Sequence, residues 1–300
     1  MSASTTNGPG RNGSQDEATG QGAQEAQAAR AAEAIAEIVE GRRTLIVSGA
    51  GMSTDSGLPD YRGVGTTPIE PVDLPAFATD PVWYRWLWFR NEATWRSLEA
   101  LEPNAGHRAL ARLEAAGAIM GVATQNVDRL DARAGVRQLW ELHGSYDTVV
   151  CLRCGARSTR AEVSERLRAL NPDLVEDLDP MRLEITPEAR RAEAEACDFR
   201  TVDCEECGGL LKPGIVMFGE GLPEEAMDGA LAAARESEAV IVAGTSLAVS
   251  TGMWVVQSAL ASGASLVVIN RGPTQADPFA EIIVDGGCSP VLAALADRLA

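Results

Sequence analysis

The sequence has almost no lysine and no long apolar run. Lys212 is the only lysine among 300 residues, so arginine carries nearly all of the positive charge, a bias explained more simply by genomic base composition than by chemistry. No apolar run reaches the roughly 18 residues that a membrane-spanning helix needs. The first 20 residues lack the apolar core of a signal peptide, and Asp16 and Glu17 argue against a transit peptide. We therefore expect a cytoplasmic protein that does not cross a membrane.

The net charge is −17, which disfavours a nucleic-acid partner because binding to phosphates needs a basic surface. The acidic surface has two interpretations: a solvated face, or a face that attracts basic protein segments. The oligomeric state is not predicted.

The order of apolar segments predicts an α/β fold. Residues 1–26 hold almost no large apolar groups, so we expect a disordered tail, followed by a helix over residues 27–41. Apolar strands are expected at residues 44–48, 118–124, 214–218, 239–243 and 265–269, with helices at 104–117, 222–238 and 251–263. This alternation predicts a Rossmann-type parallel sheet covered on both faces.

Two segments interrupt the alternation. Residues 75–101 contain Trp83, Trp86, Trp88 and Trp95, which suggests a helical insertion within about residues 64–103. Residues 148–212 hold five of the six cysteines and are expected to form a small separate domain. Residues 27–147 and 213–300 would then make up the main domain.

A glycine-rich junction follows the first strand. Gly49, Ala50 and Gly51 could let backbone amides approach a pyrophosphate. Thr54 stands where the usual fingerprint has a third glycine, so a plain strand–helix turn is the alternative. The next residues, from Ser53 to Arg62, are denser in polar groups than a simple turn requires.

Polar side chains also follow the strand at 118–124. Gln125, Asn126 and Asp128 would face the crevice at the carboxyl ends of parallel strands, where ligands bind in such sheets. The alternative is that Asn126 or Asp128 caps a helix.

Only two histidines are present, and imidazole is the side chain best suited to proton transfer near neutral pH. His107 lies at a predicted helix start and is assigned to packing or capping. His143 lies in Glu-Leu-His-Gly, where Gly144 leaves room beside it, and is the candidate base, although an isolated histidine is often structural.

Two Cys-x-x-Cys pairs indicate a metal site. Four thiolates, from Cys151, Cys154, Cys204 and Cys207, suit a closed tetrahedral zinc, which would be structural because no coordination position remains open. A redox-active dithiol is the alternative. The 49 residues between the pairs should contain a small helical element.

Three further segments lie at predicted strand ends. Lys212 to Glu220 surrounds one strand, Gly244-Thr245-Ser246 follows another, and Asn270-Arg271-Gly272 closes a third. Gly-Thr-Ser could bind a phosphate, and Asn270 could hold ribose hydroxyls. Each alone could be an ordinary turn.

Together these segments resemble the sirtuin family from about Gly41 to the C-terminus. The resemblance rests on GAGMSTDSGLPDYRG, TQNVD, ELHG, the two cysteine pairs, KPGIVMFGE, GTSL and the strand end at Asn270. The STxSG-x-PDYR form, the tryptophan-rich segment and LNPDL are most similar to class II members.

The resemblance implies a protein-lysine deacetylase or deacylase with NAD as co-substrate and structural zinc. Its substrates would be acylated proteins, bound as a strand near Val216–Gly219. His143, Asn126 and Asp128 would be catalytic, with His143 accepting a proton from a ribose hydroxyl; nicotinamide and O-acyl-ADP-ribose would leave. The residues implied to contact NAD are Gly49, Ala50, Gly51, Ser53, Thr54, Asp60, Tyr61, Arg62, Gln125, Asn126, Asp128, Gly244, Thr245, Ser246, Asn270, Arg271, Gly272 and Cys288.

Two departures from the family pattern stand out. Arg129-Leu130-Asp131 follows TQNVD where the family has Gly or Ala, Leu and His. Trp88 and Asn91 occupy the places of the Tyr-x-x-Arg pair that serves acidic acyl groups in some relatives, so succinyl-lysine is not the expected substrate. The alternatives to a deacylase are a protein ADP-ribosyltransferase, a non-catalytic NAD-binding zinc scaffold, and a thiol oxidoreductase.

Overall fold

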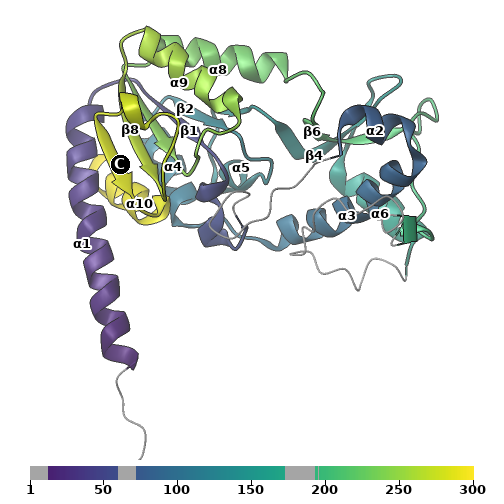
Figure 1. The fold of residues 1–300 in the computed structure, drawn as a ribbon, viewed down its shortest axis with the longest axis horizontal. Helices are drawn as coiled ribbons and strands as arrows, with labels where there is room; N and C mark the ends of the chain where they lie inside the picture. The colour runs from purple at the N-terminus through teal and green to yellow at the C-terminus, as the bar shows by residue number, and fades with distance from the viewer. Residues whose placement is uncertain (1–12, 60–71, 173–192, 195) are drawn as a thin grey trace, which may run out of the picture.

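The protein is built from two lobes, one around a large sheet and one around a small sheet (Figure 1). The structure is a computed structural model, and it describes residues 13–59, 72–172, 193–194 and 196–300. Asp60, Tyr61 and Arg62, which the sequence places in the cofactor site, lie outside the described residues.

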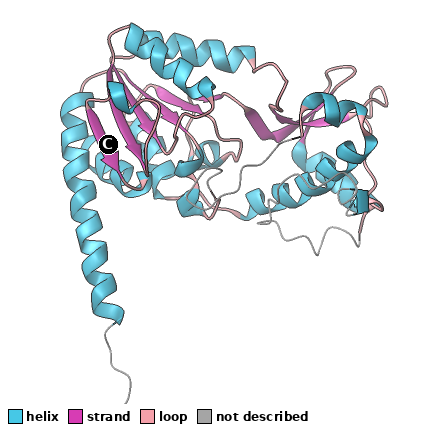
Figure 2. Ribbon diagram, in the orientation of Figure 1, coloured by secondary structure: helices cyan, strands magenta, loops and turns pink. Residues whose placement is uncertain are grey.

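The large sheet has six parallel strands in the order β3-β2-β1-β7-β8-β9. Figure 2 draws the strands in magenta and the helices in cyan. The predicted strands at 44–48, 239–243 and 265–269 are confirmed. The predicted strand at 118–124 is shorter, and the edge strands β3 and β9 were not predicted. The six strands are β1 (Thr44–Ser48), β2 (Gly121–Thr124), β3 (Leu139–Glu141), β7 (Ala239–Ala243), β8 (Ser265–Asn270) and β9 (Ile282–Asp285).

Helices cover both faces of this sheet, as the alternating pattern predicts. Strands β1 and β7 are buried at every position, because an all-parallel sheet is covered on both sides. One apolar core contains side chains of α1 (Gly13–Val39), α4 (Ala105–Ala115) and α10 (Cys288–Leu299). The other contains side chains of α8 (Glu224–Glu236) and α9 (Ser250–Ala261).

Helix α1 begins at Gly13, so the predicted disordered tail over residues 1–26 is wrong from Gly13 onward. Ala28 is the first buried residue among those whose burial is described, which agrees with the near absence of large apolar groups before it. Alanine, glutamine and glutamate nevertheless have high helix propensity, and the helix extends beyond the body of the lobe (Figure 1). Neither α1 nor any other helix of the described chain is long and apolar enough to cross a membrane.

The small sheet is antiparallel and has the order β5-β4-β6. Its strands are β4 (Gly144–Cys151), β5 (Arg157–Thr159) and β6 (Leu211–Ile215). The predicted strand at 214–218 is therefore wrong in position and partner. Pro213 cannot donate a ladder hydrogen bond, which suits an edge strand such as β6. Phe218 lies beyond the strand and is 61% exposed.

The second lobe joins the helical insertion to the cysteine-rich segment. The insertion forms α2 (Leu74–Thr79) and α3 (Pro81–Ala100), and the predicted helical element between the cysteine pairs includes α6 (Arg160–Leu170). Trp86 and Trp88 of α3 share one core with Val163 and Leu167 of α6.

A fully buried ion pair fixes α3 against α6. Arg160 Nη2 lies 2.8 Å from Glu92 Oε2, and both side chains are inaccessible to solvent. The guanidinium also stacks against the rings of Trp88 and Trp95, at 5.4 and 5.5 Å from their centroids. Trp83, Trp86 and Trp88 therefore pack the insertion against the cysteine-rich segment.

Candidate active site

The predicted site residues gather at the carboxyl ends of neighbouring strands of the large sheet. Gly49 follows β1, Gln125 follows β2 and Gly244 follows β7, and β1 pairs with both of the other strands. His143 lies two residues after the end of β3, and β3 pairs with β2. The parallel register thus brings together segments that are far apart in the sequence.

The glycines after β1 pack against the loop after β7. A Cβ atom on Gly49 would lie 2.6 Å from Thr245 Cβ, and one on Gly51 would lie 2.9 Å from Gly244 Cα. The amide of Gly51 donates to the carbonyl of Gly244 at 2.7 Å. These glycines are therefore required by contact between the two loops, a reason different from the pyrophosphate approach that the sequence suggested.

Ser53, Asn126 and Asp128 form one hydrogen-bonded group. Ser53 Oγ donates to Asp128 Oδ2 at 2.6 Å, and Asn126 Nδ2 donates to Ser53 Oγ at 3.3 Å and to the carbonyl of Gly49 at 3.0 Å. Asp128 Oδ1 also accepts from the amide of Leu130, the first residue of α5 (Leu130–Ala134), at 2.9 Å, but the N-cap position of that helix is Arg129 and not Asn126 or Asp128. The group links the loop after β1 to the loop after β2.

His143 is held at both ring nitrogens. Nδ1 lies 2.9 Å from the carbonyl oxygen of Gln125, and Nε2 lies 2.7 Å from Thr251 Oγ1. A carbonyl oxygen can only accept, so Nδ1 carries the proton and Nε2 presents its lone pair to the threonine hydroxyl. Burial lowers the pKa of His143 below its usual value, and the Gln125 carbonyl opposes this only in part. The imidazole is thus a neutral base at neutral pH.

Gln125 connects His143 to the loop after β7. Its Oε1 accepts from Thr245 Oγ1 at 2.8 Å, and its Nε2 donates to Thr251 Oγ1 at 3.2 Å and to the carbonyl of Val249 at 3.1 Å. Thr251 is the second residue of α9 and was not among the predicted site residues. No feature of the sequence singles it out except its closeness to Gly244-Thr245-Ser246.

His107 has the capping role expected from the sequence. Its Nδ1 accepts from the amide of Asn104, whose side chain in turn accepts from the first amides of α4. Burial lowers the pKa of His107 to about 4. His107 stays neutral, and its Nδ1 lone pair already accepts a hydrogen bond, so it is not a competing base.

The remaining predicted cofactor residues surround the same sheet edge. Asn270 Nδ2 donates to the carbonyls of Arg271 and Gly272, and the buried Cys288 Sγ donates to the carbonyl of Ile269 at 3.3 Å. Thr54 Oγ1 donates to the carbonyl of Gly51. The carbonyl of Ser246 accepts from the amide of Gln275, which links the loop after β7 to the segment after β8.

Gly144 lets β6 approach the histidine. A Cβ atom on Gly144 would lie 2.1 Å from the carbonyl oxygen of Gly214, and the residue has a φ of +72°. The amide of Val216 donates to the carbonyl of His143 at 2.7 Å. The room predicted beside His143 is therefore filled by the strand end that leads into Val216–Gly219.

The single lysine supports that same segment. Lys212 is 4% exposed, and its Nζ donates to the carbonyl of Ile215 at 2.6 Å and to Glu220 Oε2 at 2.9 Å. Glu220 Oε2 also accepts from the amide of Met217. The ammonium and the carboxylate thus hold the loop after β6.

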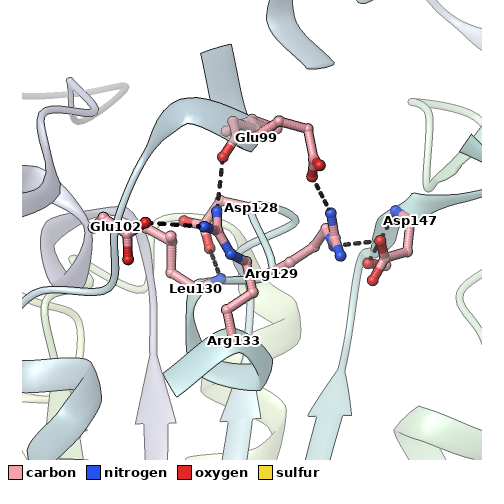
Figure 3. Close-up of polar contacts among 9 residues, drawn as sticks. Glu99, Glu102, Asp128, Arg129, Leu130, Arg133 and Asp147 are labelled. Atoms are coloured by element: carbon pink, nitrogen blue, oxygen red, sulfur yellow. Dashed lines mark hydrogen bonds and ion pairs between the residues drawn. The ribbon is translucent and has the colours of Figure 1, made fainter. Parts of the chain in front are cut away.

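The first departure, Arg129, carries charge at the junction of the two lobes. It has a φ of +70°, a left-handed conformation uncommon for a residue with a side chain. Figure 3 shows its guanidinium between Glu99 of α3 and Asp147 of β4, with Arg133 directed toward Glu102. The guanidinium also lies 5.2 Å from the centroid of the Trp95 ring.

The second departure, Asp131, is a buried acid. It is 2% exposed, and its Oδ1 has no hydrogen-bond partner among the described residues. Burial, together with the nearby carboxylates of Asp128 and Glu141, raises the pKa of Asp131 to about 7, although a hydrogen bond with Thr124 opposes the shift. Asp131 is therefore mostly protonated just below neutral pH.

Replacing Asp131 with asparagine should stabilise the protein more at pH 8 than at pH 5. The pKa in the folded state is above the ordinary value, so ionisation destabilises the fold as the pH rises from about 4 through about 7. Asparagine cannot ionise, and the gain is at most about 4 kcal/mol. Denaturant unfolding at both pH values measures it.

The exposed Asp228 of α8 provides the control, since Asp228→Asn should change the free energy of unfolding equally at both pH values. If Asp131→Asn also changed the free energy of unfolding by the same amount at both pH values, the assignment of Asp131 as a buried neutral acid would be contradicted.

The four cysteines of the two pairs come together in the second lobe. Their Sγ atoms all lie within 4.8 Å of one another, with Cys151 to Cys207 at 3.5 Å and Cys154 to Cys204 at 3.8 Å. A tetrahedral zinc with bonds of about 2.3 Å would place its sulfurs about 3.8 Å apart. A Cβ atom on Gly209 would approach two of the sulfurs at 3.0 and 3.1 Å, so the turn fits closely around them. Geometry and donor set both fit zinc.

Comparisons with known proteins agree with this geometry. The Sir2 family model matches residues 49–251. A protein of Mycobacterium avium named NAD-dependent protein deacetylase 1 is 46% identical, over 88% of this chain and 94% of its own. A protein of Streptomyces coelicolor with the same name is 38% identical, over 88% and 89%.

Solved structures show the same similarity. One described as "Structural Basis for the Mechanism and Regulation of Sir2 Enzymes" is 30% identical, with a TM-score of 0.67, over 92% of this chain and 98% of its own. Another, a Sir2 complex with 2′-O-acetyl-ADP-ribose and a deacetylated peptide, is 28% identical, with a TM-score of 0.65, over 89% and 96%.

Proposed function

Because this chain belongs to the Sir2 family and is an NAD-dependent protein deacetylase, we propose that His143 is the base of its reaction. The observation that carries this role is the fixed orientation of the ring, since Gln125 holds the proton on Nδ1 and leaves the lone pair on Nε2. A neutral imidazole with a defined tautomer suits general-base catalysis near neutral pH.

NAD supplies the ribose that receives the acyl group and the nicotinamide that leaves, and the residues at the sheet edge would bind it. Ser53, Asn126 and Asp128 would hold the nicotinamide end, because their mutual hydrogen bonds fix the amide and carboxylate in place. The loops at Gly49–Gly51 and Gly244–Ser246 would hold the phosphates, and Asn270 to Gly272 with Cys288 the adenosine end. The products are the deacylated lysine, nicotinamide and O-acyl-ADP-ribose.

The protein substrate would bind as a strand beside Val216–Gly219. This segment continues from the edge strand β6, and hydrogen bonds from the side chains of Lys212 and Glu220 hold its backbone. An extended peptide can form backbone hydrogen bonds with such an edge and present alternate side chains to pockets. The carbonyl of His143 already binds the first amide of the segment, so an acyl-lysine bound there would lie near the base.

The zinc would be structural, and the cysteine-rich part of the chain, residues 148–212, would form its domain. All four thiolates are used for coordination, and such a zinc has no open position for a substrate. The free thiols among the described residues suit a reducing compartment, and we propose a cytoplasmic location.

The function is tested by incubating the protein with NAD and an acetyl-lysine peptide. We expect mass spectrometry to show deacetylated peptide, nicotinamide and O-acetyl-ADP-ribose in equal amounts. Peptide carrying ADP-ribose, or NAD consumed without loss of the acetyl group, would contradict the proposal.

Acetyl-lysine and longer aliphatic acyl-lysines should be turned over more efficiently than succinyl-lysine. Val127, between Asn126 and Asp128, packs with Trp95, Tyr146 and Ile215 in an apolar cluster. We propose that this cluster forms the acyl pocket, where each buried methylene contributes about 0.8 kcal/mol. Arg129 and Arg160 both lie over the Trp95 ring of this cluster, and both are already paired with carboxylates, so neither is free to neutralise a buried succinyl carboxylate.

Values of kcat/KM for acetyl, octanoyl and succinyl forms of one peptide decide the acyl preference. A higher value for the succinyl peptide would show that a cation is available in the acyl pocket and would disprove the apolar assignment.

A further inference from the structure

The hydroxyl of Thr251 stands at the one atom of His143 that can act as a base. Nε2 of the neutral ring has a single lone pair, and Thr251 Oγ1 lies 2.7 Å from it. Since Nδ1 carries the proton, the threonine must be the donor in this hydrogen bond. A ribose hydroxyl that approaches Nε2 of His143 would therefore contact the Thr251 hydroxyl first.

The surroundings of Thr251 fix the direction of its hydrogen bonds. Gln125 Nε2 donates to Oγ1 at 3.2 Å, while Gln125 Oε1 is occupied by Thr245 at 2.8 Å, so the amide cannot turn around. Thr251 Oγ1 thus donates once, to His143, and accepts once, from Gln125. A hydroxyl oxygen has two lone pairs, and the second can accept one more donor.

We propose that Thr251 relays a proton from the ribose hydroxyl to His143, an inference that rests on the proposed role of His143 as base. Thr251 Oγ1 receives the ribose proton while its own proton passes to Nε2. The threonine ends as a hydroxyl again, His143 becomes an imidazolium, and the ribose oxygen keeps the electron pair with which it attacks the acyl carbon. Proton number and charge balance without any further reactant.

The alternative geometry has the ribose hydroxyl displace Thr251 from Nε2. The two geometries differ in the contribution of the Thr251 hydroxyl. The relay requires this hydroxyl, whereas in the displacement geometry it only competes with the ribose hydroxyl for Nε2. Thr251 is 6% exposed and is the second residue of a helix packed against the sheet, so displacement would require backbone or rotamer movement inside a buried contact.

The test compares Thr251→Val, which keeps the shape and removes the hydroxyl, with Thr251→Ser, which keeps the hydroxyl. We expect the valine variant to lose about 10²–10³-fold in kcat, because base catalysis contributes about 10²–10⁴. The serine variant should recover most of that loss. In a His143→Ala background, Thr251→Val should cause no further loss, since residues that act as a unit are not additive.

Two measurements without turnover separate a relay from a structural role. Calorimetry should show NAD affinity in the valine protein reduced by no more than about tenfold, far less than the loss in kcat, because only one hydrogen bond to the ribose is lost. Nitrogen-15 NMR of the NAD-free protein should show that the Nε2 resonance of His143 changes in the valine variant and returns in the serine variant.

A valine variant with the wild-type kcat, or a serine variant as slow as the valine variant, would overturn the relay. So would a loss of NAD affinity as large as the loss of rate, because that would show a displaced Gln125. If His143→Ala kept the full rate, the assignment of His143 as the base would be wrong. If Thr251→Val kept the full rate and His143→Ala did not, only the relay would be wrong.

Discussion

Replacing His143 with alanine should slow deacetylation by about 10²–10⁴-fold, the usual contribution of a positioned general base. The ring donates through Nδ1 to Gln125 and accepts at Nε2, and alanine removes both functions. NAD affinity should be retained, because the Ser53, Asn126 and Asp128 group does not depend on the imidazole. Steady-state kcat for an acetyl peptide and calorimetry with NAD measure the two quantities.

The other histidine is the matched control for this experiment. His107→Gln removes the imidazole that completes the cap of α4, so it should lower the free energy of unfolding by about 0.5–2 kcal/mol. Its kcat should remain far above that of His143→Ala. An undiminished kcat in His143→Ala, or equal losses in the two variants, would show that the base lies elsewhere.

Removal of the proposed zinc should destabilise the second lobe by several kcal/mol. Cys151 ends β4, and Cys204 is buried beside it, so the four thiols join the small sheet to the turn before β6. Structural zinc supplies folding energy directly, and apparent binding energies in small zinc modules are about 10–16 kcal/mol. We expect one zinc per chain, and Cys204→Ser should lose both the zinc and the stability.

Cys197→Ser is the matched control, because Cys197 is an exposed thiol outside the cluster. It should keep the zinc content and the unfolding midpoint of the wild type. Elemental analysis that finds no zinc in freshly purified protein would refute the structural metal, as would a Cys204→Ser variant with unchanged stability.

Short polar motifs after apolar strands predicted which segments would gather at the candidate site. The parallel sheet brings strand ends to one edge, so Gly49, Gln125 and Gly244 had to lie together once the strands were recognised. The histidine could be chosen because the other one follows an asparagine typical of a helix cap. These inferences use neighbours in the sequence and one topological rule.

Other features depend on contacts between distant segments and could not be predicted. Thr251 looks like an ordinary helix residue until the fold sets it against His143. The pairing of Arg160 with Glu92 needs the packing of α6 on α3. The apolar run at 214–218 resembles a core strand, but its partner is β4, whose alternating polar residues gave a weak signal.

The buried lysine has a consequence for the enzyme's own chemistry. The substrates of a deacylase are acylated ε-amino groups of lysine. This chain has one lysine, Lys212, whose ammonium is engaged with Glu220 and a backbone carbonyl. The cationic side chains of the surface are arginines, whose guanidinium groups stay protonated. The protein therefore offers no exposed lysine that could become its own substrate.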